Sequence, residues 1–438
     1  MLTCPLHNGL HAMRPPLTLL RLVVLLAFVG CAAGCATCRL PTPADGAEAR
    51  VNTSLPGDQR EATAALSARA SVVVWSDAGA ASAGRGIFGQ RFDTAGGLVG
   101  CEFRVDSVQS APDVIARVPD VAMNASGASV VVWEVVTGAV DTSAVDVFAR
   151  RYDRAGRALG TRIRVSTAPS HLTAVPAVAV AASGAFAVAW QSDGSAPDTP
   201  DVLVRHFSAQ GVAPDGPSRV NGSTVRGQGQ MQPDIAMAPG GASVVVWFDY
   251  GRNGEADVLA RRYGADGTAD GDSFLVHASS PQLAEQVPAV ALDASGAFVV
   301  AWQTAAPVGS NHGPGITAQR FNAAGDSVGG PVAVSPAADV SQSLPAVAVG
   351  PGGRAHVVWQ RARPQLSTEP VQLNDVFART LGPDGPVGLP VLVNERSVGY
   401  QRVSSVAMDL EGNALVVWDA AHPDGKNQDV YVRRYRIR

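Results

Sequence analysis

Apolar residues follow one another in short runs over most of the chain, separated by turns that contain glycine. The stretch from 288 to 302 reads P-A-V-A-L-D-A-S-G-A-F-V-V-A-W, in which D-A-S-G separates two apolar runs. Short apolar runs bounded by turn residues are typical of β-strands, and glycine supplies the positive φ angle that many tight turns need. The pattern predicts a pair of antiparallel strands that ends at Trp302.

This strand pair occurs seven times, and each copy ends in one of the seven tryptophans. The copies end at Trp75, Trp133, Trp190, Trp247, Trp302, Trp359 and Trp418. Val stands two residues before every tryptophan and Ala eleven residues before it, from Ala64 in the first copy to Ala407 in the last. Side chains two residues apart share one face of a strand, so each Val and Trp should enter the core together. A repeat that fills the chain indicates the fold class before any local motif does.

Two more strands follow each tryptophan. The third strand is clearest at 257–263, D-V-L-A-R-R-Y, and a turn then leads to a fourth strand that ends in Val276. Four short strands in each unit of about 57 residues are typical of a propeller blade. The sequence therefore predicts an all-β fold, a seven-bladed β-propeller of four-stranded blades.

The two ends of the repeat region complement each other. The last copy stops at Arg438, three residues after Tyr435, and lacks a fourth strand, whereas A-R-V-N at 49–52 matches S-R-V-N at 218–221 in the third copy. We expect residues 50–54 to complete the last blade, because such closure leaves no unpaired sheet edge. The predicted propeller spans residues 49–438.

The first residues predict export. An apolar run at 22–30 follows Arg14 and Arg21, which is typical of a signal peptide and too short for a transmembrane helix. F-V-G-C at Cys31 and A-A-G-C at Cys35 resemble the cleavage box of bacterial lipoproteins, which implies a lipid on one of these cysteines; plain secretion is the alternative. We expect a signal peptide at 1–35, a flexible tether at 36–48 and a start at Met1 or Met13.

Composition excludes some partners. A net charge of −4 with 34 Lys and Arg gives no basic patch for nucleic acid, so membrane contact is expected only through the lipid anchor. Cys35 and Cys38 have C-x-x-C spacing but no second ligand pair, so we expect no metal there. Cys101 is expected to be a small buried residue. The protein is expected to be a monomer.

Connection lengths indicate where a site should lie. The distance from each tryptophan to the end of strand three varies from 16 to 22 residues, and the link from strand four to the next copy also varies. Both connections emerge on one face of a propeller, and variable loops are where ligands bind. The ligand-binding candidates on that face are Asp193, Asp198, Asp249, Tyr250, His312, Glu369, Tyr400 and Asp424.

Other polar positions have simpler interpretations. The segment 249–255 partly matches a calcium loop, but it lacks the second and last ligands, so no cofactor is expected and calcium is the alternative. The Asp that begins strand three and the paired arginines near its end recur in most copies. Recurrence favours structural roles, as an acceptor for backbone N–H groups and as partners of aromatic rings or carbonyls.

The repeat units V-V-A-W-Q and A-Q-R-F-N-A-A-G-D-S-V-G-G resemble tandem Trp-containing propeller repeats of bacterial surface and secreted lipoproteins. The resemblance implies a location at the cell envelope or outside the cell and assigns no catalytic residue. Our hypothesis is a non-enzymatic module that binds a glycan, peptide or protein through its variable loops. The alternative is a polysaccharide hydrolase or lyase with carboxylates from several blades at the axial opening.

Overall fold

The computed structural model folds Leu40–Arg438 into one compact unit. The structure describes residues 46–53, 57–79, 85–106, 114–138, 143–193, 200–221, 227–251, 256–277, 286–304, 313–337, 340–364, 373–396, 399–421 and 427–437. These ranges contain no helix with the length and hydropathy that crossing a lipid bilayer requires.

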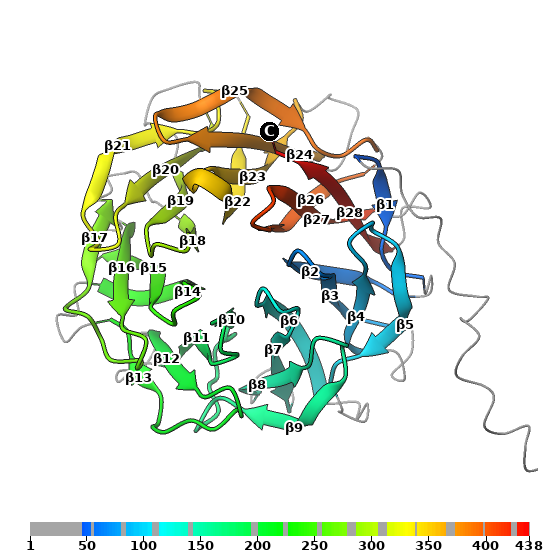
Figure 1. Ribbon diagram of the computed structural model, residues 1–438, viewed down its shortest axis with the longest axis vertical. Coiled ribbons are helices and arrows are strands. Elements are labelled where there is room, and N and C mark those ends of the chain that lie inside the picture. Colours follow the sequence, from blue (N-terminus) through cyan, green and yellow to red (C-terminus); the bar gives the residue numbers. More distant parts are fainter. Residues whose placement is uncertain are drawn as a thin grey trace, which may run out of the picture. The chain divides into compact units, whose positions relative to one another are not determined.

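Seven antiparallel sheets of four strands form a ring around a common centre, so the predicted fold is confirmed (Figure 1). From the innermost strand outward, blade 1 contains β2 (Gln59–Leu66), β3 (Ser71–Asp77), β4 (Gly86–Phe92) and β5 (Leu98–Arg104); blade 2 contains β6 (Val114–Met123), β7 (Ser129–Thr137), β8 (Ala144–Tyr152) and β9 (Ala158–Arg164); blade 3 contains β10 (Ala177–Val180), β11 (Phe186–Ser192), β12 (Asp201–Phe207) and β13 (Ser218–Arg219). Blade 4 contains β14 (Gly227–Met237), β15 (Ser243–Gly251), β16 (Ala256–Tyr263) and β17 (Phe274–His277); blade 5 contains β18 (Gln286–Leu292), β19 (Phe298–Thr304), β20 (Gly315–Phe321) and β21 (Ser327–Ala333). Blade 6 contains β22 (Gln342–Val349), a short 3₁₀ turn η2 (Pro351–Gly353), β23 (Ala355–Ala362), β24 (Asn374–Gly382) and β25 (Gly385–Leu392); blade 7 contains β26 (Gln401–Met408), β27 (Asn413–Ala421), β28 (Gln428–Arg436) and β1 (Glu48–Arg50).

The first strand of the chain closes the ring, as the sequence predicts. Strand β1 lies antiparallel to β28, with Ala49 opposite Val432. Next along the chain, Asn52 accepts a hydrogen bond from the N–H of Val430 at 2.9 Å and donates one to Asp429 at 2.8 Å. The closing strand begins at Glu48, one residue before the expected boundary of the propeller.

The core is divided among the seven junctions between blades. Seven clusters of buried apolar residues each join two neighbouring blades, and each cluster contains one tryptophan. Every tryptophan side chain is 2% exposed or less, which confirms the prediction that these rings are core. Valines that alternate along the second strand contact the preceding and the following blade in turn, so each blade helps to hold both neighbours.

The innermost strands share one irregularity. Five of them contain a residue with positive φ where the pairing register shifts: Glu61, Val118, Gln232, Val287 and Leu344. In blade 3 the equivalent residue, Val175, also has a positive φ and lies two residues before β10. The turn after β2 is one residue shorter than in the other copies, so the structural equivalent of Ala122 in blade 1 is Ala65 and not Ala64. The count of eleven residues before tryptophan therefore misaligns this one strand.

The arginines near the end of strand three tie neighbouring blades together, which confirms the structural interpretation of their recurrence. Blades 2, 4 and 7 carry both arginines, and each of the other four carries one. The first arginine reaches back to the valine carbonyl that ends the preceding blade, as in Arg150 to Val105 at 2.7 Å and Arg379 to Val334 at 2.8 Å. The second reaches forward to a turn of the following blade, as in Arg91 to the Arg154 carbonyl at 2.9 Å. Polar links thus surround the apolar core of a junction.

The junction of blades 6 and 7 departs from this rule for a physical reason. The outer strand of blade 7 comes from the other end of the chain, so no turn joins it to β28. Blade 7 therefore has no turn carbonyl there that an arginine of blade 6 could bind. Thr380 occupies the arginine position, and His356 bonds Thr380 at 3.2 Å and the Tyr435 hydroxyl at 2.7 Å. Burial lowers the pKa of His356 to about 4, so the imidazole is neutral.

The expectation for Cys101 is wrong. This residue lies on the outermost strand of blade 1, where it is exposed, and it is disulfide-bonded. Outermost strands have the blade core on one side only, so their residues alternate between contact and solvent.

Candidate functional site

The variable connections follow each tryptophan strand and precede each innermost strand, so they emerge together on what we call the loop face. The opposite face, called the turn face, carries the short turns between strands one and two and between strands three and four. The predicted residues Asp198, His312, Glu369 and Asp424, and the lipidation candidates Cys31 and Cys35, lie outside the described residues.

Three of the remaining candidates lie on blades 3 and 4. Asp193 is exposed and accepts a hydrogen bond from the His171 N–H at 2.8 Å, which holds the link from blade 2 to blade 3. Asp249 is 6% exposed on β15. Tyr250 follows it, with its ring inclined at 62° to that of Phe248 and the ring centroids 6.0 Å apart.

Tyr400 lies in a charged group at the centre of the loop face. It precedes β26 in blade 7, and the charges of Arg60 and Arg402 lower its pKa while burial, the larger effect, raises it. We call the group of Arg60, Glu61, Arg117, Glu134, Tyr400, Arg402 and Asp419 the axial cluster. These residues lie at the loop-face end of an innermost strand, or directly opposite that end on the neighbouring strand.

The three arginines of the axial cluster occupy equivalent positions on blades 7, 1 and 2. Each arginine lies at, or one residue before, the point where the pairing register shifts. Its backbone partner on the neighbouring strand is the residue that follows a tryptophan, as Asp419 is for Arg402. The side chains of Arg60 and Arg117 are 49% and 41% exposed, and Arg402 is also exposed. The other four blades carry uncharged residues there: Ala174, Met231, Gln286 and Ser343.

Carboxylates lie beneath these arginines and join the blades. Asp419 accepts the N–H of Glu61 at 2.7 Å, Glu61 accepts that of Val118 at 2.8 Å, and Glu134 accepts that of Ala174 at 2.6 Å. Each acceptor binds the irregular inner strand of the following blade, whose N–H has no strand partner on the axial side. Asp419 and Glu134 are fully buried.

Burial changes the acidity of these groups. It raises the pKa of Asp419 to about 6, although two backbone N–H groups and Arg402 act in the opposite direction. Burial also raises the pKa of Glu134, and Arg117, bound at 2.6 Å, opposes this change. The axial cluster thus exposes its arginines above the buried carboxylates of Asp419 and Glu134, and Arg60 is also paired with the partly exposed carboxylate of Asp58.

Two further carboxylates lie on innermost strands. Asp120 accepts the N–H of Val178, and Asp234 accepts that of Val290, both at 2.8 Å. An innermost strand has a single neighbour, so its free N–H groups point to the axis. Burial raises the pKa of Asp120 to about 6 and that of Asp234 to about 7, and the charge of Asp120 contributes to the latter.

The recurring Asp before strand three is structural, as expected, but its partners differ from the prediction. Asp201 bonds Arg219 at 2.5 Å and the Asn221 amide at 2.8 Å, and it is Asn221 that accepts the backbone N–H of Val202. The prediction that Asp itself accepts backbone N–H groups is wrong. The sequence carried the signal, because Arg-Val-Asn, Arg-Val-Ser or Arg-Val-Asp ends several copies.

Sequence reasoning also missed a glutamine that orients tryptophan. The indole N–H of Trp359 donates to Gln342 at 3.0 Å, and that of Trp418 donates to Gln401 at 3.0 Å. Gln230 does the same for Trp247. Each glutamine lies 17 residues before its tryptophan, a spacing that could have been found by alignment.

At the turn-face end, the axis opens into a cavity of about 560 Å³. Equivalent apolar residues of all seven blades line it: Leu66, Met123, Val180, Met237, Leu292, Val349 and Met408. Apolar residues at this end contrast with the charges at the other.

The described residues contain no group of three His, Cys, Asp or Glu side chains that could hold a metal ion. Within the partial calcium motif, Asp249 is buried, and residues 252–255 lie outside the described ranges. Calcium therefore stays an alternative from the sequence.

No family model matches the chain, and no curated protein matches it. A crystal structure of a protein of unknown function from Dyadobacter fermentans is 11% identical, with a TM-score of 0.51, and the match covers 91% of this chain and 100% of that chain. The polysaccharide lyase Uly1 is 11% identical over 84% of this chain and 88% of its own, with a TM-score of 0.49. The α-L-arabinanase of Penicillium chrysogenum, complexed with arabinobiose, is 13% identical over 72% and 92%, with a TM-score of 0.45. At these identities the likeness shows the fold alone.

Proposed function

We propose that this protein is a binding propeller, anchored in the bacterial cell envelope or secreted, that recognises an acidic glycan through the axial cluster. One observation carries the proposal: Arg60, Arg117 and Arg402 reach solvent from equivalent positions on three neighbouring blades. Guanidinium groups present planar pairs of N–H donors, which suit carboxylates.

The regular spacing of the three arginines favours a polymer as the ligand. Equivalent positions on successive blades repeat around the axis, and a uronate-containing polysaccharide carries negative charges that also repeat. Carboxylates hold two of the arginines in place, because Glu134 binds Arg117 at 2.6 Å while it also accepts a backbone N–H, and Asp58 is paired with Arg60. Such preorganisation lowers the entropy that the side chains lose on binding.

Affinity electrophoresis of the purified full chain tests this proposal. Gels that contain polygalacturonate or alginate should retard the protein, gels that contain dextran should not, and added salt should weaken the retardation. The triple variant Arg60→Gln, Arg117→Gln, Arg402→Gln should lose most of the retardation.

Arg157→Gln is the matched control, because this arginine is 81% exposed and lies in a turn on the other face. It removes one positive charge without touching the axial cluster. Equal retardation by dextran, or full retardation of the triple variant, would sink the proposal.

A second candidate function is polysaccharide cleavage at Asp120 and Asp234. Their raised pKa values, about 6 and about 7, favour it, since a carboxylic acid that is protonated near neutral pH can act as a general acid. Asp120→Asn and Asp234→Asn keep an acceptor oxygen for the strand N–H and remove the acid. Turnover of a polysaccharide that both variants lose supports this function, and the absence of turnover by the unmodified protein contradicts it.

A further inference from the structure

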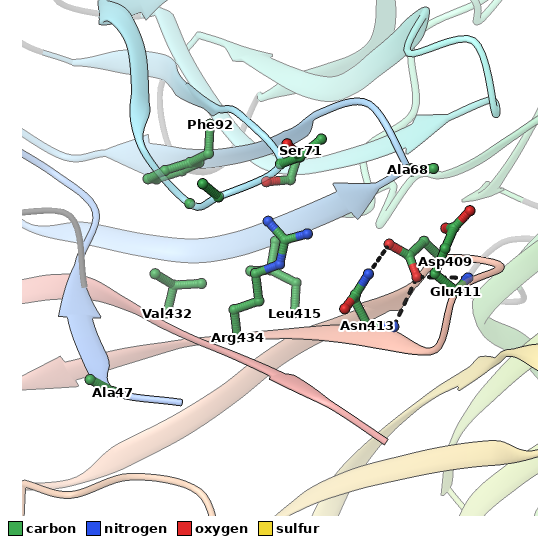
Figure 2. A pocket seen from close by; sticks show the side chains of 13 residues that line it. Ala47, Ala68, Ser71, Phe92, Asp409, Glu411, Asn413, Leu415, Val432 and Arg434 are labelled. Carbon is green, nitrogen blue, oxygen red and sulfur yellow. Dashed lines mark hydrogen bonds between the residues drawn. The ribbon is translucent and has the colours of Figure 1, made fainter. Parts of the chain in front are cut away.

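The junction of blades 7 and 1, where the ring closes, encloses a second cavity on the turn face. Its volume is about 420 Å³, within the range of about 300–1,000 Å³ typical of small-molecule sites. Figure 2 shows Phe92 and Ser71 on one side, Asn413 and Glu411 on another, and the Arg434 guanidinium between them.

The cavity exists because the closing strand is short and carries a small residue. Strand β1 has three residues, whereas the outer strand of blade 1, β5, has seven. Ala49 takes the position that Phe103 occupies in blade 1, and the Phe103 ring packs against Tyr152 of the next blade at 5.7 Å. Phe92 is the equivalent of Tyr152, so at the closing junction its ring has no such partner from β1.

The glycines in the turns between strands three and four show whether the preceding blade covers each turn. A Cβ atom placed on Gly156 would lie 2.1 Å from Arg91, and one on Gly325 would lie 3.1 Å from Arg262, because the preceding blade covers these turns. A Cβ atom on Gly96, the equivalent glycine at the closing junction, would have no atom within 4 Å. Gly385, which follows Leu381 by four residues as Gly96 follows Phe92, is also open, so the closing junction differs from the covered turns at Gly156 and Gly325 and shares its open turn with blade 6.

The walls of the cavity combine an apolar surface with one available cation. Phe92, Leu415 and Val432 are 7%, 4% and 6% exposed. The Arg434 side chain makes one hydrogen bond among the described residues, to the Asp93 carbonyl at 3.3 Å. The equivalent Arg262 holds the Ala323 carbonyl at 2.7 Å. Arg434 thus keeps N–H donors for a ligand, next to an apolar surface.

We propose that this cavity binds a small organic monoanion, a carboxylate with an apolar body. The carboxylate would pair with Arg434, and the apolar body would lie against Phe92, Leu415 and Val432. Asp409 and Glu411 line the same cavity, and Asp409 accepts hydrogen bonds from the Asn413 N–H at 2.8 Å and the Asn413 amide at 2.7 Å, which offset its charge. A second negative charge on the ligand is therefore unfavourable. This site is independent of the axial cluster and lies on the opposite face.

Calorimetric titration of the full chain with benzoate tests the proposal, with phthalate and benzylamine as charge variants. Benzoate should bind at one site, and phthalate and benzylamine should bind at least about tenfold more weakly. Arg434→Gln should weaken benzoate binding at least about tenfold, since a charge-assisted hydrogen bond is lost. Arg262→Gln, at the junction of blades 4 and 5, should leave it unchanged.

Ala49→Phe provides a second route that keeps Arg434. The new ring should fill the cavity against Phe92, as Phe103 does against Tyr152, and so abolish benzoate binding while the melting temperature stays the same or rises. No saturable binding of benzoate, equal binding of benzylamine, or unchanged binding by both Arg434→Gln and Ala49→Phe would overturn the proposal. Failure here leaves the glycan proposal untouched, because that test uses polymers and the other face.

Discussion

The two halves of the axial opening on the loop face have the same backbone and different side chains. Blades 1, 2, 4, 5 and 6 place a positive-φ residue at the register shift of the innermost strand, and blade 3 places one, Val175, two residues before β10. Yet the residue opposite the one that follows tryptophan is arginine on blades 7, 1 and 2, and Ala174, Met231, Gln286 or Ser343 on the others. Residues that recur in every blade are therefore those that the fold requires. Residues that depart from the repeat on adjacent blades are those that a ligand could require.

The largest expected effect tests whether the scaffold is equal in both halves. Trp133 and Trp302 lie in opposite halves, are both fully buried, and both have an indole N–H without a partner among the described residues. Trp133→Ala and Trp302→Ala should each lower the free energy of unfolding by about 3–5 kcal/mol, because each leaves a large cavity. Chemical denaturation measures this. A difference well above about 1 kcal/mol between the two would show that the halves are not equivalent scaffolds.

A smaller effect tests the closing strand against an ordinary blade. Asn52 and Asn221 play the same part, since each accepts the N–H of a residue in strand three and donates to the preceding Asp. Asn52→Ala and Asn221→Ala should each cost about 1–3 kcal/mol by leaving buried polar groups unpaired. If melting of the Asn52→Ala variant matches the unmodified protein, β1 does not hold the ring closed.

The next effect concerns Asp234, whose pKa rises from 3.8 to about 7 through burial. Between about pH 4 and pH 7, the folded protein keeps a proton that the unfolded chain has lost, so this group lowers stability as the pH rises. The loss is complete above about pH 7. Asp234→Asn should therefore raise the free energy of unfolding at pH 8 by on the order of 2 kcal/mol and change it little at pH 4. A gain that is the same at both pH values would refute the assignment.

The fold could be read from the sequence because it depends on residues that recur. The constant spacing of Val and Trp and the match of 49–52 to 218–221 both arise because each blade packs in the same way. The structure confirms both predictions. The prediction of Tyr400 on the loop face rested on loop variation, and the structure places it in the axial cluster.

The rest of the axial cluster could not be found in this way. The shorter turn after β2 displaces Arg60 in the alignment, together with Glu61, the acceptor for the Val118 N–H. The support given by Asp419 joins residues 358 positions apart in the chain. The cavity at Arg434 depends on a contact that Ala49 is too small to make with Phe92. The absence of a contact has no motif in the sequence.

The measurement that tests the account most directly compares the halves of the axial opening by binding. Biolayer interferometry with an immobilised oligogalacturonate should show that Arg402→Gln weakens binding about tenfold, through the loss of one charge-assisted pair, with an unchanged melting temperature. Ser343→Ala, at the equivalent position of blade 6, should change neither quantity. Equal affinity for Arg402→Gln and the unmodified protein, or an equal loss for Ser343→Ala, would contradict the claim that the three arginines form the site.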